Sequence, residues 1–549
     1  MLTRIAEPIA WAALWALLVA VALATRPLLP VDETRYLTVA WEMWASGDML
    51  VPHLNGAPYS HKPPLLFWLI NLGWQVFGVS ELWGRLVAPL FGLGSLFLTY
   101  AAAGMLWPGA PGVRSLAPWV LLGSLVWVGA TTLSMFDGML TFFTLTALIG
   151  VLRAAGDRSA MAAPRRTRQV LGWALFGLGI GLGILSKGPV ILVFALPVAV
   201  LAPLWLRRPR RSWLAWYAGL LGGLGFGAGV ALAWALPAAE SGGEAYATAI
   251  LWGQTSGRVL QSFAHGRPFW WYLPMLLLLL FPWVLWPPLW RAIARLEVRA
   301  DAGAAFCWVW FAGGLVLLSL ISGKQPHYVL PMAPAFALLV ARAGATVLRA
   351  PTHWTGGLPG AAVVAAGLVI AGAALWQGDS RRLGGSALPE GAGSALLWLA
   401  LALVVVGAVS ILWRPRFGTG RIMVLALQSV SVVIAIHLIL GAAAASIYDL
   451  RGAAQTIAMF QSEGRAIANV GKYHGQYHFL GRLERPIASI DGGSVAAWFE
   501  SNPDGLVISY HRNFSVEAGT PVYSQNYRGR TLGIWAREAA LTDLERFKR

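Results

Sequence analysis

The feature that most constrains this chain is a series of thirteen apolar stretches between residues 8 and 446. A segment of roughly 20 apolar residues is long enough to cross the hydrocarbon core of a bilayer as a helix. The first stretch is too long for a removable signal peptide and lacks a small-residue cleavage site, so we expect it to remain as a membrane helix. The sequence therefore predicts an all-α polytopic membrane protein with about 13 transmembrane helices. The stretches lie near 8–29, 84–107, 115–134, 138–154, 170–186, 188–206, 213–237, 268–290, 303–322, 329–348, 358–376, 392–413 and 422–446.

Composition supports a membrane protein and argues against a nucleic-acid-binding protein. Hydrophobic residues make up 57% of the 549 residues and charged residues 12%, whereas a soluble domain has roughly 25% charged residues. A net charge of +17 would suggest nucleic acid in a soluble protein, but here the arginines cluster between apolar stretches. We therefore expect membrane lipids as surroundings and no nucleic-acid partner. The single Cys307 excludes an intrachain disulfide.

The basic loops predict the orientation. Alternate connections carry an excess of arginine, and the positive-inside rule places such loops in the cytoplasm. All five fall on one side if Met1 is inside, so the last hundred residues are expected outside. The loops are "RAAGDRSAMAAPRRTR", "RRPRR", "RAIARLEVR", "RAPTH" and "RPRFGTGR".

The C-terminal tail differs from the rest of the chain. Four strand-like runs, "HFLGRL", "PIASID", "GLVISYH" and "GIWARE", accompany one helical run, "GSVAAWFES". We predict a transmembrane domain over 1–448, with a first outer loop at 30–83, and a small α/β domain over 449–549.

Unusual polar residues gather at the outer rim. Six motifs fall on that side while the cytoplasmic loops carry arginines but no comparable motif, so the sequence predicts an active site at the outer membrane boundary. The motifs are "VDETRY" (31–36), "YSHKPPLLFW" (59–68), "MFDGML" (135–140), "SKGP" (186–189), "FAHGRPFWWY" (263–272) and "GKQPHYVLP" (323–331).

These residue types favour chemistry on a lipid-linked phosphate. Cations with a phenolic hydroxyl make a receptor for a phosphate at headgroup depth, and carboxylates beside them suit a developing positive sugar. The predicted phosphate-binding residues are Lys62, Arg267, Lys324 and Tyr328; the predicted catalytic carboxylates are Asp32, Asp137 and Glu33; Arg35, Tyr59 and Lys187 are predicted to support them.

Simpler roles remain open for several of these residues. Glu33 could cap the following helix, Lys62 could reach the interface with its ammonium, and Lys187 could be a boundary charge. A zinc-like divalent ion held by His265 and His478 is a further hypothesis, although polar outer segments often contain histidine.

The combination of "DETRY", "KPP" and "GKQPHY" with thirteen spans and an outer C-terminal domain resembles the GT-C class of membrane glycosyltransferases. Within that class the chain is most similar to the bacterial transferases of 4-amino-4-deoxy-L-arabinose (aminoarabinose) to lipid A, which are related to protein O-mannosyltransferases. The resemblance implies Asp32 and Asp137 as the acidic positions, and Lys62 and Arg267 with Tyr328 as the phosphate-binding ones. His61 stands where the family often has an acidic residue, so no carboxylate role carries over to that position.

The resemblance also implies the substrates. The donor would be undecaprenyl-phosphate-linked aminoarabinose and the acceptor a lipid A phosphate, at the periplasmic face of the bacterial inner membrane, a modification of lipopolysaccharide that lowers polymyxin sensitivity. Alternatives are a GT-C enzyme that moves another polyprenyl-linked sugar, such as a protein O-mannosyltransferase, and a lipid transporter. A transporter would need polar residues at mid-membrane depth and internal repeats, whereas this chain keeps its charges at one rim.

Overall fold

The structure is a computed structural model of the whole chain. It describes residues 2–156, 165–207, 209, 212–257, 266–346, 357–376, 382–383, 386–387, 392–415, 418–511 and 519–547.

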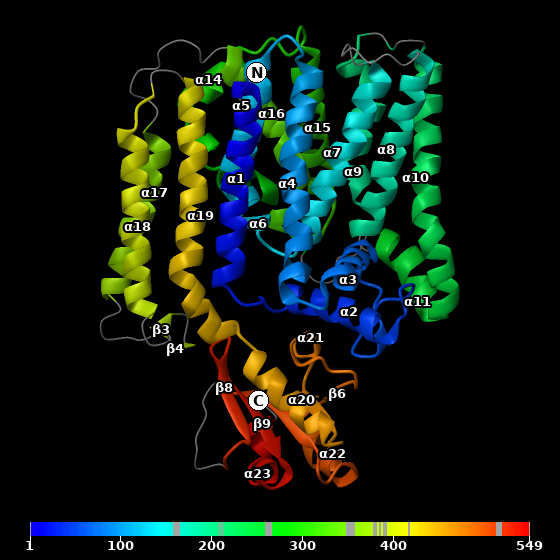
Figure 1. The fold of residues 1–549 in the computed structure, drawn as a ribbon, viewed down its shortest axis with the longest axis vertical. Coiled ribbons are helices and arrows are strands. Elements are labelled where there is room, and N and C mark those ends of the chain that lie inside the picture. The colour runs from blue at the N-terminus through cyan, green and yellow to red at the C-terminus, as the bar shows by residue number, and fades with distance from the viewer. Residues whose placement is uncertain are drawn as a thin grey trace.

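A bundle of long apolar helices forms the main body of the protein (Figure 1). Within the described ranges, ten helical segments are long and apolar enough to cross a membrane, and each coincides with one of the thirteen predicted stretches. The expected multi-pass helical fold is thus confirmed. The ten are α1 (Leu2–Thr25), α4 (Glu81–Leu106), α7 (Phe136–Ala155), α8 (Arg165–Lys187), α10 (Trp213–Gly242), α15 (Ala302–Leu320), the 3₁₀ helix η5 (Pro326–Met332) continued by α16 (Ala333–Thr346), α17 (Leu358–Trp376), α18 (Ala392–Leu412) and α19 (Gly418–Tyr448).

The other three predicted stretches are shorter or broken. Proline explains the breaks in two of these stretches, since it removes a backbone donor and clashes with the preceding turn. In the stretch 188–206, Pro197 lies near the end of helix α9, and in the stretch 268–290, Pro282 and Pro287 interrupt the helix. The remaining break, at Ser124, has a tertiary cause, because Leu125 N donates to the carbonyl of Phe281 at 3.0 Å. The pieces are α5 (Pro111–Gly123), α6 (Leu125–Ala130), α9 (Ile191–Val200), η1 (Ala202–Leu204), η3 (Phe269–Trp271), α13 (Tyr272–Leu279), η4 (Trp283–Leu285) and α14 (Pro287–Ala294).

The first loop folds into a layer across one end of the bundle. Figure 1 shows α2 (Asp32–Ser46) and α3 (Leu65–Phe77) at the lower end, between the bundle and the C-terminal domain. The short strands β1 (His53–Leu54) and β2 (Ala57–Pro58) pair antiparallel between these two helices. At the same end, α10 is followed by α11 (Glu244–Thr248) and the π-helix η2 (Ala249–Gly257). Two further short strands, β3 (Arg382–Leu383) and β4 (Ser386–Ala387), pair between α17 and α18.

Residues after α19 form an α/β unit around a five-stranded sheet of order β6-β5-β7-β9-β8. The β6-β5-β7 pairs are parallel, and the pairs that β9 makes with β7 and β8 are antiparallel. The predicted strand at 478–483 is wrong, since His478–Gly481 is helical, and β5 and β8 were not predicted. The elements are α20 (Arg451–Ser462), β5 (Ile467–Val470), α21 (His478–Gly481), β6 (Ala488–Ile490), η6 (Gly492–Ser494), α22 (Val495–Ser501), β7 (Leu506–His511), β8 (Tyr523–Tyr527), β9 (Arg530–Ala536), α23 (Arg537–Leu541) and η8 (Leu544–Phe547).

The C-terminal unit docks directly on α2. Thr38 Oγ1 donates to the carbonyl of Gly475 at 2.6 Å, and Trp41 Nε1 donates to that of Leu483 at 2.9 Å. The rings of Trp74 and Phe479 stack at 5.5 Å with an interplanar angle of 4°. The layer formed by the first loop is therefore held from both sides, by the bundle and by the C-terminal unit.

Candidate active site at one end of the bundle

A buried ion pair joins the adjacent ends of α7 and α8. Asp137 lies in the first turn of α7, Lys187 is the last residue of α8, and Lys187 Nζ is 2.5 Å from Asp137 Oδ1. The side chain of Asp137 is 3% exposed. Each charge also complements the dipole of its own helix, because anions are favoured at N-termini and cations at C-termini. The antiparallel packing of two spanning helices thus places a neutralised carboxylate at the rim.

The 3₁₀ helix η5 contributes two neighbouring aromatic side chains to this site, His327 and Tyr328. His327 Nε2 lies 4.0 Å from Asp137 Oδ2, and Lys187 Nζ lies 4.7 Å from the ring centroid of Tyr328. Tyr328 was predicted as a site residue from its motif, whereas His327, its direct neighbour, was not. A lone histidine carries little signal in a sequence; only its place inside "GKQPHY" could have pointed to it.

The second predicted carboxylate has a different environment. Asp32 Oδ1 forms an ion pair with Arg35 and accepts a hydrogen bond from Tyr36 Oη at 3.1 Å. Its side chain is 48% exposed, so Asp32 is open to solvent where Asp137 is enclosed. The Tyr36 ring packs edge-on against Phe136 with 4.8 Å between centroids, which sets the start of α2 beside the start of α7.

Lys62 approaches the same place from the Pro-Pro turn of the first loop. Its Nζ lies 5.4 Å from the ring centroid of Phe136, the residue before Asp137. Tyr59 is buried in the same loop, 5.3 Å from the His61 ring. The charges of Asp32, Lys62, Asp137 and Lys187 all lie close enough to affect His327. The structure therefore brings together residues from five separate sequence motifs.

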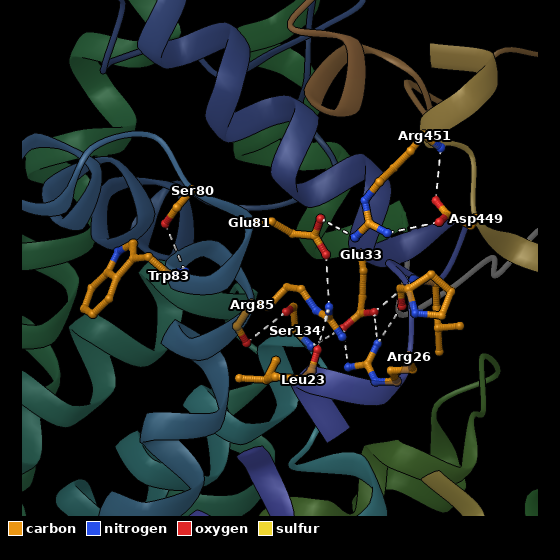
Figure 2. A network of polar contacts seen from close by, with 12 residues as sticks. Leu23, Arg26, Glu33, Ser80, Glu81, Trp83, Arg85, Ser134, Asp449 and Arg451 are labelled. Atoms are coloured by element: carbon orange, nitrogen blue, oxygen red, sulfur yellow. Dashed lines mark hydrogen bonds and ion pairs between the residues drawn. The ribbon is translucent and has the colours of Figure 1, made fainter. Parts of the chain in front are cut away.

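Glu33 faces away from this cluster and into the protein. It forms an ion pair with Arg26, which also donates to the carbonyl of Thr132 at 2.8 Å. The backbone N–H groups of Leu29 and Ser134 donate to its two oxygens at 3.0 and 2.8 Å (Figure 2). Burial raises the pKa of Glu33, but the Arg26 guanidinium and these backbone donors outweigh burial and hold the pKa below its ordinary value. Through these hydrogen bonds, Glu33 connects the start of α2, where Asp32 lies, to the turn that precedes Asp137.

Lys324 and Arg267 lie on a second rim segment. The Lys324 side chain is buried, and its Nζ donates to the backbone carbonyls of Ile321 and of Arg267, the latter at 3.2 Å. Arg267 N also donates to the carbonyl of Ser322 at 3.1 Å. Lys324 therefore fixes the backbone of Arg267, whose own side chain is exposed, and retains one further donor, since an ammonium has three.

The metal hypothesis gains no support from the described side chains. His265 lies outside the described residues. His478 is buried in the C-terminal unit, its Nδ1 is 2.7 Å from Tyr473 Oη, and burial lowers its pKa to about 4. Within the described part of the chain, no three His, Cys, Asp or Glu side chains come together to hold a metal ion.

Comparison with solved structures identifies the fold of the whole chain. The crystal structure of ArnT from Cupriavidus metallidurans in the apo state superposes with a TM-score of 0.74, covering 97% of this chain and 98% of that one at 20% sequence identity. The chain has the ArnT fold. The structure of the same ArnT bound to undecaprenyl phosphate gives a TM-score of 0.73 at the same coverage.

Sequence comparisons agree with the ArnT fold. Residues 9–240 match the family model of dolichyl-phosphate-mannose-protein mannosyltransferase. The undecaprenyl phosphate-alpha-4-amino-4-deoxy-L-arabinose arabinosyl transferase of Erwinia tasmaniensis is 31% identical over 333 residues, 60% of this chain and 58% of that protein. The enzyme of the same name from Pseudomonas aeruginosa LESB58 is 34% identical over 330 residues, 58% of this chain and 56% of that protein. The matched region spans less than two thirds of the length of these relatives. These similarities confirm the resemblance to aminoarabinose transferases that was predicted from the sequence.

Proposed function

We propose that this protein is a glycosyltransferase that moves 4-amino-4-deoxy-L-arabinose from undecaprenyl phosphate to a phosphate of lipid A. The reaction would take place at the periplasmic face of the bacterial inner membrane, and the modified lipopolysaccharide would lower polymyxin sensitivity. The names of the similar curated enzymes support the donor and the sugar, and the ArnT complex with undecaprenyl phosphate supports the lipid carrier.

The observation that carries this proposal is the pairing of an open carboxylate with a buried, neutralised one beside several cations. Asp32 is half exposed and Asp137 is enclosed with Lys187. Lys62 lies against the residue before Asp137. A polyprenyl-phosphate sugar presents a phosphate and a sugar that becomes positive as its bond to phosphate breaks, so it needs both kinds of charge in one place.

The chemical step exchanges one phosphate for another at the sugar. An oxygen of the acceptor phosphate attacks the anomeric carbon, the new carbon–oxygen bond forms, and the bond to undecaprenyl phosphate breaks, leaving that phosphate with the electron pair. Lys62 and Arg267 would bind the departing phosphate, because charge-assisted hydrogen bonds strengthen as its charge grows. Tyr328 would contribute a hydroxyl donor to the same group, and Tyr59 would support the loop that carries Lys62.

Asp32 would act through its charge. A phosphate monoester has a second pKa near 6, so an acceptor of this kind is already a nucleophile at neutral pH and removal of a proton would contribute little. Asp32 would instead stabilise the positive sugar ring or its ammonium and orient the donor, with Arg35 and Tyr36 fixing the carboxylate. The ion pair of Asp137 with Lys187 would supply a fixed dipole to the same site.

Glu33 is better assigned to positioning than to contact with the substrate. Its oxygens accept from Arg26, Leu29 N and Ser134 N, so contact with a sugar would require these bonds to break. By joining the two backbone segments that carry Asp32 and Asp137, it would set the separation of the two carboxylates.

The alternative of sugar transfer to a protein hydroxyl rests on the mannosyltransferase family match over residues 9–240. A hydroxyl must lose its proton during attack, so that enzyme would need a general base. The pH dependence of an Asp32 variant therefore separates the two acceptors.

Loss of phosphate contacts tests the proposed donor site. Lys62→Ala and Arg267→Ala should each reduce transfer of aminoarabinose to lipid A by about ten- to a hundredfold, because a hydrogen bond to a charged group contributes about 1.5–3 kcal/mol. Mass spectrometry of lipid A from cells that express each variant provides the readout, with membrane protein levels measured in parallel. Arg291→Ala, an exposed cation of α14 at the far end of the bundle, serves as the control and should modify lipid A as the wild type does. Wild-type modification by either site variant would contradict the phosphate assignment.

A further inference from the structure

A second charged cluster surrounds a cavity between the ends of three spanning helices. The cavity has a volume of about 390 Å³, which is within the range of small-ligand sites. It lies where α1 ends, α4 begins and the chain leaves α19 for the C-terminal unit. Its lining includes Arg26, Glu81, Leu82, Arg85, Ala445 and Arg451.

The ion pairs around this cavity leave Arg85 incompletely bonded, and the Nε of Arg26 also lacks a partner among the described residues (Figure 2). Glu81 is shared, since its two oxygens accept from Arg85 Nη1 at 3.0 Å and from Arg451 Nη2 at 2.8 Å. The Arg85 side chain is 4% exposed, and its Nε and Nη2 have no hydrogen-bond partner among the described residues. A buried donor without a partner destabilises the fold, so a bound group with spare acceptor oxygens would stabilise this arrangement.

The charges around the cavity favour an anion as that group. Three arginines and one glutamate line it. Glu33 pairs with Arg26 and Asp449 pairs with Arg451 from outside the lining, so Arg85 is left to share a single carboxylate. A guanidinium offers several donors in a plane, which matches the oxygens of a phosphate.

The position of the cavity favours a lipid as the source of the phosphate. The helices that end around it, α1, α4 and α19, are all apolar enough to span a membrane, so the cavity lies at the depth of lipid headgroups. Leu82 and Ala445 give the lining an apolar side, which suits the glycerol and acyl carbons of a lipid. We propose that this cavity binds the phosphate of a membrane phospholipid, at a site separate from the one that contains Asp32 and Lys62.

Native mass spectrometry of the full-length protein in detergent can test this proposal. The probe is a short-chain phosphatidylglycerol, titrated against protein that carries Lys62→Ala so that binding at the proposed donor site does not contribute. In this background Arg85→Gln should weaken the lipid by about tenfold or more, since it removes a charge-assisted contact. Glu81→Gln should tighten it several-fold, because Arg85 and Arg451 lose their competing carboxylate. A folding defect would weaken binding and could not mimic the Glu81→Gln result.

Three controls define the outcomes. Arg421→Gln removes another buried arginine at the opposite end of α19 and should leave the lipid affinity unchanged. A diacylglycerol of equal chain length should not bind, and inorganic phosphate at the same concentration should not displace the lipid. Wild-type affinity in Arg85→Gln, weaker binding in Glu81→Gln, or binding of the diacylglycerol would overturn the proposal, and full displacement by inorganic phosphate would overturn the assignment to a lipid. Because the readout is lipid binding, its failure is distinct from a failure of sugar transfer.

Discussion

At the scale of single residues, environment rather than residue type separates the two aspartates of the site. Asp32 has a half-exposed side chain and neighbours from its own helix, Arg35 and Tyr36, while Asp137 is enclosed and neutralised by Lys187, fifty residues away. An exposed charge is free to meet a substrate, and an enclosed one is fixed before the substrate arrives. Two of the predictions below follow from this difference.

The first concerns Asp32. Asp32→Asn removes the charge but keeps the shape, so it should lose sugar transfer at every pH from 7 to 9 if the carboxylate acts electrostatically. The measurement is a pH–rate profile with lipid A as acceptor. Recovery of the asparagine variant as pH rises would show that a proton must be removed, and would favour the hydroxyl-acceptor alternative.

The second concerns Lys187 and Asp137. Lys187→Met leaves Asp137 buried beside His327 without its ammonium partner, and breaking a buried pair in this way costs about 3–5 kcal/mol. The loss should be partly recovered in the double variant Lys187→Met with Asp137→Asn, since no charge then remains without a partner. Thermal unfolding in detergent of the four proteins gives the coupling energy. Additive effects of the two substitutions would mean that the pair does not stabilise the fold.

The site residues that could be predicted from the sequence are those with a strong local pattern. Asp32, Lys62 and Asp137 stand out because a charged residue at the end of an apolar stretch is unusual. Glu33 was predicted to act in catalysis or to cap the following helix; its buried contacts could not be predicted, because its partner Ser134 lies 101 residues away and no local pattern reveals that contact. His327 was missed for the same reason, since its nearness to Asp137 depends on how η5 packs against α7.

At the scale of elements, α2 is the joint on which the site depends. Its buried face includes Tyr36, which packs on the start of α7, and Thr38 and Trp41, which bind the loop 471–483 of the C-terminal unit. The same short helix carries Asp32 and Arg35. Loosening the contact with the C-terminal unit should therefore disturb the carboxylate site from a distance.

Gly475→Ala tests this joint. A Cβ at residue 475 would lie 2.6 Å from Leu54 Cδ1 and 2.9 Å from Thr38 Cγ2, and Gly475 also has a φ of +78°. Gly471, with a φ of +80° and nothing within 4 Å of an added Cβ, provides a matched control for backbone strain alone. Both alanine variants should incur about 1–2 kcal/mol for the left-handed backbone, and only Gly475→Ala should incur the further 1–3 kcal/mol of overpacking.

Hydrogen–deuterium exchange of the full-length protein is the measurement for this pair. Gly475→Ala should raise exchange in α2 as well as in the loop around residue 475, whereas Gly471→Ala should change its own loop only. Equal effects of the two variants on α2 would show that contact with Leu54 and Thr38 does not hold the joint.

At the scale of the whole molecule, the helical bundle was predictable because twenty apolar residues have few alternatives in a membrane. The break at Ser124 was not, since Leu125 N donates to the carbonyl of Phe281 and Trp283 Nε1 to Ser124 Oγ, and such contacts between distant segments leave no local signature. The C-terminal unit was harder still. Its "HFLGRL" run has the residues of a strand but begins with a short helix that packs against α2.

The orientation of the whole molecule is the last prediction. The described helix ends that flank the basic loops, among them α14 with Arg291, lie at the end of the bundle that the positive-inside rule assigns to the cytoplasm, and the carboxylate site lies at the other end with the C-terminal unit. Alkaline phosphatase, which is active only in the periplasm, should therefore be active when fused after residue 448 and inactive when fused at 209 or at 160, the last of which lies outside the described residues. A fluorescent protein that matures only in the cytoplasm should give the opposite pattern at the same positions. If phosphatase activity followed the basic loops instead, the site would face the cytoplasm and a donor presented in the periplasm could not reach it.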